Sequence, residues 1–173
     1  TVTEPASIVA TATGNYVLCN GGTTSVTVSA TGGSTPYSGV GTFTVGAGSY
    51  TYTVTDANGC STTASITINE PTALSASSSQ GAAILCNGGT TTVTVAASGG
   101  TAPYIGTGTF TVAAGTHNYT VLDANGCVAN TSITVSEPSV VVATVTQTAA
   151  ILCNGGTATI TVTGSGGTAP YSG

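Results

Sequence analysis

Five cysteines are the residues of this sequence most capable of chemistry, and they recur at regular positions. Cys19, Cys86 and Cys153 each lie in the motif Leu-Cys-Asn-Gly-Gly, at a spacing of 67 residues. Cys60 and Cys127 each end the motif Asp-Ala-Asn-Gly-Cys, again 67 residues apart. Cysteines can ligate a metal, act as reactive thiols or form disulfides. Because the chain has no Cys-x-x-Cys pair and no companion histidine, the spacing favours disulfides.

The separation between the two motifs predicts which cysteines pair. Cys19 and Cys60 lie 41 residues apart, and so do Cys86 and Cys127. We therefore expect the disulfides Cys19–Cys60 and Cys86–Cys127, each stabilising its unit by roughly 4 kcal/mol. By the same spacing, the partner of Cys153 is expected outside the chain. A disulfide framework of this kind indicates an oxidising, extracellular compartment.

The period also predicts how the chain is divided. We expect repeat 1 over residues 6–71, repeat 2 over residues 72–138, and the first half of an incomplete repeat 3 over residues 139–173. Residues 1–5 match the end of repeat 2 and are expected to be the last strand of a preceding repeat. The chain is thus expected to be a window of a longer array. A unit this small buries only about 60% of its unfolded surface, so an added cross-link is favoured.

Four acidic residues near turns are candidate calcium ligands. Asp56 and Asp123 each begin an Asp-Ala-Asn-Gly turn, and Glu70 and Glu137 each precede a proline. The turns lack the further oxygen ligands and the terminal Glu of a calcium loop. An Asp side chain that caps its own backbone in a tight turn is the preferred interpretation, and an interdomain calcium site is the alternative. We expect no cofactor.

Three tyrosines and two asparagines are candidates for contact with sugars. Tyr37, Tyr104 and Tyr171 each follow a proline, so their rings could stack on a glycan. More often such a tyrosine packs at the edge of a β-sandwich and donates its hydroxyl to the backbone. Asn118 and Asn130 fit the N-glycosylation sequon, a short pattern that also arises by chance.

His117 is the only histidine, and the equivalent position in repeat 1 is Tyr50. No positioned carboxylate or nucleophile accompanies it, so a general base is not indicated. We expect an ordinary strand residue at this position. The sequence contains no other constellation typical of an active site, and we expect the protein not to be an enzyme.

The elements that must position these residues are short strands. Val93 and Val95 alternate with threonines, the period-2 pattern of a half-buried strand. Asn125-Gly126 supplies the positive φ of a tight hairpin. Expected strands in repeat 2 cover residues 73–79, 92–96, 108–112, 117–122 and 131–135. With six or seven short strands per unit, we predict an all-β chain of tandem antiparallel sandwiches of immunoglobulin-like kind, stacked as a rod.

The charge composition narrows the classes of partner. The chain has no Lys or Arg and only five acidic residues. Binding to nucleic acid or anionic lipid by phosphate neutralisation is therefore not expected. Thr, Ser and Gly interrupt every apolar stretch, so no membrane insertion is expected either. Because no Lys protects the edge strands, we expect edges or flat Thr-rich faces to pack against neighbouring copies, as in a fibre.

Five landmarks follow one another in a fixed order: Cys-Asn-Gly-Gly, Gly-Gly-Thr-Ala-Pro-Tyr, Ala-Gly-Thr before Tyr-Thr-Val, Asp-Ala-Asn-Gly-Cys, and Glu-Pro. Over essentially the whole chain, this order resembles the SprB-type repeat of very large secreted surface proteins of gliding bacteria. The resemblance implies a repetitive cell-surface adhesin or filament without catalytic activity in the repeat. We expect the structural repeat region of an extracellular filament or stalk. The alternative is a set of adhesin repeats that bind polysaccharide or other cell surfaces.

Overall fold

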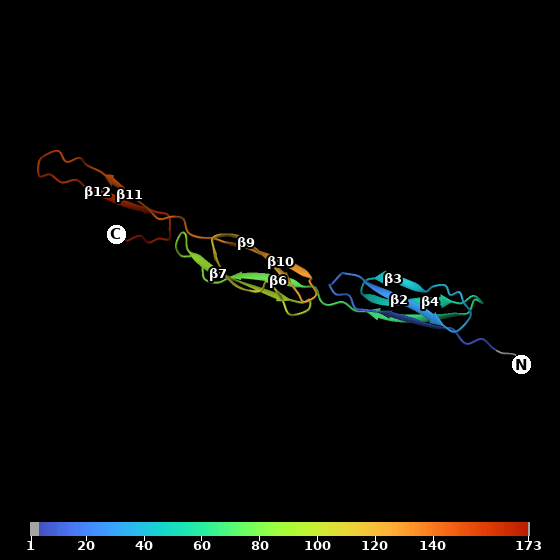
Figure 1. Ribbon diagram of the computed structural model, residues 1–173. Helices are drawn as coiled ribbons and strands as arrows, with labels where there is room; N and C mark the ends of the chain where they lie inside the picture. The colour runs from blue at the N-terminus through green and yellow to red at the C-terminus, as the bar shows by residue number, and fades with distance from the viewer. Residues whose placement is uncertain (1–3, 173) are drawn as a thin grey trace. The chain divides into compact units, whose positions relative to one another are not determined.

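The computed structural model describes residues 4–172, which form short antiparallel strands joined by turns (Figure 1). No helix occurs among these residues, and accordingly none that is long and apolar enough to span a membrane. The all-β class is confirmed. The strands are β1 (Val9–Gly14), β2 (Thr24–Thr31), β3 (Gly41–Val45), β4 (Gly48–Thr55), β5 (Ser61–Ile68), β6 (Ser75–Gln80), β7 (Thr90–Ser98), β8 (Gly108–Ala113), β9 (Gly115–Leu122), β10 (Val128–Val135), β11 (Val142–Gln147) and β12 (Ile160–Ser165).

The described chain divides into two compact units. Unit 1 contains residues 4–75 together with Ala97–Ile105 and Val121–Ala129. Unit 2 contains Ala76–Ala96, Gly106–Thr120 and residues 130–172. Unit 1 therefore includes both Asp-Ala-Asn-Gly-Cys motifs. The strand expected over residues 1–5 lies mainly outside the described residues, and Glu4 and Pro5 are not in a strand.

Two sheets of unit 1 share one apolar core. One sheet has the order β1-β2-β3, and the other pairs β4 with β5. Val26 and Val28 of β2 cluster with Val54 of β4, Ile68 of β5 and the loop residue Val17. All five are at most 3% exposed, whereas the alternate residues of β2 lie at the surface. The period-2 alternation therefore sets which face of each strand is buried.

The same alternation occurs in unit 2. In β7, Val93 and Val95 are 0% and 2% exposed, and Val93 pairs with Phe110 of β8. The Phe110 ring lies 5.0 Å from the ring of Tyr119 in β9. The corresponding pair in unit 1, Phe43 and Tyr52, has a centroid distance of 4.8 Å.

The number of strands differs from the prediction. Residues 72–138 contain five strands, β6 to β10, rather than six or seven. The strands are longer than expected, since β7 has nine residues and β10 has eight. The connecting segments turn at glycines with positive φ, among them Gly88, Gly99 and Gly106, and so form loops instead of further strands.

Candidate functional site

A disulfide in unit 1 between Cys19 and Cys127 is the centre of the candidate functional site. The Cα atoms of the two cysteines are 5.7 Å apart. Beside the disulfide, the Asn125 side-chain amide donates to the carbonyl oxygen of Leu18 at 3.0 Å and to Thr101 Oγ1 at 3.1 Å. The disulfide therefore joins the first Leu-Cys-Asn-Gly-Gly motif to the second Asp-Ala-Asn-Gly-Cys motif. The hydrogen bonds of Asn125 fix the two segments in register.

This disulfide corrects the predicted pairing. The pairs Cys19–Cys60 and Cys86–Cys127 are both wrong, because Cys19 and Cys127 are bonded to each other. Three exposed free thiols remain in the described chain, those of Cys60, Cys86 and Cys153. That Cys153 pairs with a residue outside the chain stays a prediction.

The path of β5 explains why Cys60 cannot reach Cys19. Cys60 immediately precedes the first residue of β5, whereas the loop before Cys19 is bonded beyond its last residue, through Val17 N and Asn69 O at 2.9 Å. β5 has eight residues. At about 3.3 Å per residue the Cα atoms of its first and last residues lie roughly 23 Å apart. A disulfide needs Cα atoms within about 7 Å, so the two cysteines are at opposite ends of the sheet.

The loop that carries Cys19 is held by the Glu-Pro segment of the same unit. Gly22 N donates to Cys19 O at 2.9 Å, which closes the turn. Gly21 N donates to Glu70 Oε2 at 2.6 Å, and the Asn20 amide donates to Pro71 O at 3.1 Å. Glu70 therefore orders the loop that presents Cys19.

The same contacts occur in unit 2 around Cys86. Gly89 N donates to Cys86 O at 3.0 Å, and Gly88 N donates to Glu137 Oε2 at 2.6 Å. The Asn87 amide donates to Glu137 Oε1 and to Pro138 O, both at 3.1 Å. The Cys86 loop is thus ordered in the same way, although its thiol is free.

The two Asp-Ala-Asn-Gly turns are capped by their own aspartates, as predicted. Asp56 Oδ1 accepts from the backbone N–H groups of Asn58 and Cys60, both at 2.9 Å, and Oδ2 accepts from Ser34 N at 3.0 Å. Asp123 accepts from the backbone of Asn125, Cys127 and Thr101, each at 2.9 Å. Each carboxylate thereby ties a hairpin turn to a neighbouring loop.

The structure does not bring the four candidate calcium ligands together. Asp56 precedes β5 and Glu70 follows it, so the two carboxylates lie at opposite ends of the strand; Asp123 and Glu137 flank β10 in the same order. Within residues 4–172, no three His, Cys, Asp or Glu side chains are grouped closely enough to hold a metal ion. At Asp56 and Asp123, backbone N–H groups already bind both carboxylate oxygens that calcium would require.

Backbone hydrogen bonds lower the pKa of both aspartates below the ordinary value of 3.8. For Asp56, the N–H of Ser34 is the largest cause, and it outweighs the opposing effect of burial on the pKa. For Asp123, only 3% exposed, burial is the largest single influence and would raise the pKa. The N–H groups of Thr101, Cys127 and Asn125 together outweigh it.

We expect these carboxylates to contribute to acid denaturation. Because their folded pKa is lowered, their stabilisation is fully present above the unfolded pKa of 3.8 and is lost as the pH falls through the folded value. Asp56→Asn with Asp123→Asn should lower the Tm by several degrees at pH 7 and flatten its decline below about pH 4. Circular dichroism melts from neutral to acidic pH measure this. The Glu4→Gln variant should retain the decline of the parent chain.

The prolyl-tyrosine residues donate to the backbone of the preceding turn. Tyr37 Oη donates to Gly32 O at 2.5 Å, and Tyr104 Oη donates to Gly99 O at 2.7 Å. Tyr171 makes the equivalent bond to Gly166 O. The predicted hydroxyl-to-backbone bond is confirmed at all three positions. Sugar stacking by these rings stays a prediction.

Tyr37→Phe and Tyr104→Phe should each lower the free energy of unfolding by about 1 kcal/mol, because each removes one hydrogen bond and leaves a carbonyl oxygen with one partner fewer. Urea unfolding followed by circular dichroism measures the change. Tyr16→Phe serves as the control, because Tyr16 is 61% exposed, and it should change stability little. An equal loss in all three variants would contradict the role of the turn bond.

His117 and the two sequon asparagines lie on strands. His117 is in β9, where its Nε2 lies 2.9 Å from Ala113 O, and the prediction of an ordinary strand residue is confirmed. Asn118 in β9 and Asn130 in β10 are both exposed, and Asn130 Oδ1 accepts from Thr120 Oγ1 at 2.8 Å. Both asparagines line one shallow surface hollow. Their glycosylation stays a prediction.

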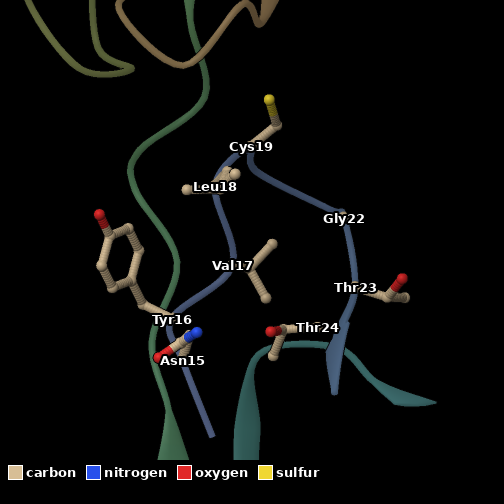
Figure 2. A pocket seen from close by; sticks show the side chains of 8 residues that line it. All are labelled: Asn15, Tyr16, Val17, Leu18, Cys19, Gly22, Thr23 and Thr24. Carbon is tan, nitrogen blue, oxygen red and sulfur yellow. The ribbon is translucent and has the colours of Figure 1, made fainter.

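A surface hollow lies beside the Cys19 loop (Figure 2). The Val17 side chain, only 1% exposed, belongs to the core beneath the loop, whereas Cys19 Sγ points away at the tip of the loop in Figure 2. The hollow is lined by uncharged residues: Asn15, Tyr16, Val17, Leu18, Cys19, Gly22, Thr23 and Thr24. The one cysteine of this lining, Cys19, is bonded to Cys127, so the lining offers no free thiol.

Asn125 and Leu18 are the site residues that sequence reasoning missed. A signal for them was present, because both cysteine motifs recur with the same period. A cysteine of the first motif could therefore pair with the nearer or the next copy of the second motif. No model of a known protein family matches this sequence, and a search of curated proteins gives no match.

Proposed function

We propose that this chain is a structural, non-catalytic repeat region of an extracellular surface filament or stalk. The observation that carries the proposal is the Cys19–Cys127 disulfide, which links one 67-residue copy of the sequence to the next. A covalent link between successive copies resists their separation under load. Such a bond is also stable in an oxidising compartment rather than in the cytosol.

Tandem repetition and an immunoglobulin-like sandwich belong to this proposal. Two sheets that share one apolar core in unit 1 support the sandwich. The contacts of the Cys19 loop recur around Cys86, and those of Asp56 recur around Asp123, which supports repetition. Stacking of these repeats as a rod and the resemblance to the SprB-type repeat are part of the same proposal.

The lack of basic residues supports association with further copies. Lysine on an edge strand opposes pairing with another chain, and the sequence contains no Lys or Arg. The strands are rich in Thr and Val and nearly free of charge, which favours contact between edges or flat faces of neighbouring copies.

Electron microscopy and analytical ultracentrifugation of the oxidised chain test the proposal. We expect fibres or elongated oligomers whose fraction rises with protein concentration. A chain that stays strictly monomeric at high concentration would contradict self-association into a fibre. The alternative, adhesin repeats that bind polysaccharide, instead predicts specific binding of the same chain on a glycan array.

A further inference from the structure

A second hollow in unit 1 lies beside the free thiol of Cys60. It is lined by three parts of the chain that are distant in sequence: Glu4–Ile8, Gly33, and the turn that leads into β5 with the start of that strand. The lining residues are Glu4, Pro5, Ala6, Ser7, Ile8, Gly33, Asp56, Asn58, Cys60, Ser61 and Thr62. The Cys60 thiol is exposed to solvent and accessible from this hollow.

The hollow beside Cys60 corresponds to the place where the Cys19 loop is bound elsewhere in the same unit. The smaller hollow around the disulfide is lined by Cys19, Asn20, Ala73, Leu74, Cys127 and Val128. Gly99 approaches Ala73 O as Gly32 approaches Ser7 O, and Gly100 faces Leu74 as Gly33 faces Ile8. The Ser7 side of the Cys60 hollow therefore has the geometry of the occupied site without the loop.

The side chain of Asn58 marks the missing contact. At the occupied site, the Asn125 amide donates both to Thr101 Oγ1 and to Leu18 O. The Asn58 amide donates to Ser34 Oγ at 2.9 Å, which is the counterpart of the first bond. In Asn58, the second amide hydrogen is therefore available for a carbonyl oxygen of an incoming loop.

The Leu-Cys-Asn-Gly-Gly loops whose cysteines are free have the features needed to bind such a hollow. Leu18, next to the bonded Cys19, is 53% exposed, whereas Leu85 and Leu152, next to the free cysteines, are 80% and 90% exposed. The Cys86 loop already has the conformation of the Cys19 loop, since Glu137 and Pro138 hold it through equivalent bonds. A preformed loop reduces the entropy lost on docking.

We infer that the hollow beside Cys60 receives a Leu-Cys-Asn-Gly-Gly loop from a second copy of this chain, and that Cys60 forms a disulfide with Cys86 or Cys153 of that copy. Two thiols lose two protons and two electrons as the S–S bond forms. A low-molecular-weight disulfide such as oxidised glutathione takes them up and is released as two thiols. The bond has the register of Cys19–Cys127, and it joins motifs of unlike type only.

This inference names the partner for the proposed structural role, and in that respect it rests on the proposed function. The two can fail separately. Fibres that form while Cys60 stays reduced would overturn the proposed cross-link but would still agree with the proposed filament. Cross-links between Cys60 and Cys86 or Cys153 in a preparation without fibres would overturn the filament but would still agree with the cross-link.

Oxidation of mixed chains tests the cross-link. An equal mixture of ¹⁵N-labelled and unlabelled full-length chain is reduced, reoxidised with glutathione and separated on a non-reducing gel. Trypsin has no site, since the chain has no Lys or Arg, but chymotryptic cleavage after Tyr, Phe and Leu places each cysteine in a separate peptide. Mass spectrometry should then find isotopically mixed Cys60–Cys86 or Cys60–Cys153 peptides at roughly tenfold or more over Cys60–Cys60.

A matched pair of variants separates docking from random thiol oxidation. Ser61→Arg places a long side chain in the hollow and should lower the yield of mixed Cys60 peptides roughly tenfold. Ser65→Arg, at another exposed position of β5, should leave the yield unchanged. Cys19–Cys127 peptides report that both variants fold. Comparable amounts of Cys60–Cys60, or a Cys60 that stays reduced while Cys19 and Cys127 oxidise, would overturn the inference.

Discussion

Replacing Cys19 by serine is expected to lower the free energy of unfolding of unit 1 by about 5 kcal/mol. The disulfide closes a loop of 108 residues. Its main effect is to limit the conformations of the unfolded chain, and that effect grows with the length of the closed loop. For a protein of this size, the loss corresponds to a decrease in Tm on the order of 10 °C or more.

Urea unfolding followed by circular dichroism measures this loss, with the protein dilute enough to be monomeric. Cys127→Ser should give the same loss as Cys19→Ser, and the double variant should be no less stable than either single variant, because all three remove one bond. Cys60→Ser is the control and should change stability little. If Cys60→Ser instead lowered the free energy of unfolding as much as Cys19→Ser, the pairing Cys19–Cys60 within a single 67-residue repeat would be correct.

The features predicted correctly from sequence are those fixed by short-range chemistry. The alternation of Val and Thr around Val93 and Val95 was sufficient to place a strand and to identify its buried face. An aspartate two residues before an asparagine in a tight turn accepts from the backbone next to it, so the caps at Asp56 and Asp123 were predictable as well.

The disulfide could not be predicted, because pairing depends on where the chain goes between the motifs. Separations of 41 and 108 residues agree equally well with a 67-residue period. Only the course of β5, which places Cys60 and Cys19 at opposite ends of a sheet, excludes the shorter one. The role of Asn125 in binding Leu18 O depends on the same long-range arrangement.

The number of strands was overestimated for a related reason. Glycines predicted as boundaries between many short strands instead form loops between fewer, longer ones. Gly99 and Gly100 both have positive φ, and Gly100 N donates to Thr72 O at 2.8 Å. That bond ties the turn to the segment before β6, a contact between residues far apart in sequence.

The close approach at this turn makes Gly99→Ala the substitution with the second large expected effect. Gly99 has a φ of +72°, and a Cβ added there would lie 2.0 Å from Ala73 O. The left-handed conformation alone costs a non-glycine residue about 1–2 kcal/mol. Since a backbone carbonyl cannot move aside as a flexible side chain can, Gly99→Ala should lower the free energy of unfolding by about 4 kcal/mol or more.

Gly126→Ala is the matched control for the contribution of that contact. Gly126 also lies in unit 1 and has a φ of +81°, but an added Cβ would meet nothing within 4 Å. Gly126→Ala should therefore show only the conformational cost, about 1–2 kcal/mol, in the same urea experiment. Gly32→Ala, where Ser7 O would be 2.1 Å from the added Cβ, should behave like Gly99→Ala. Equal losses of stability for Gly99→Ala and Gly126→Ala would contradict this account. They would show that glycine is needed at position 99 for its backbone conformation alone, and not for the packing of the turn against the segment before β6.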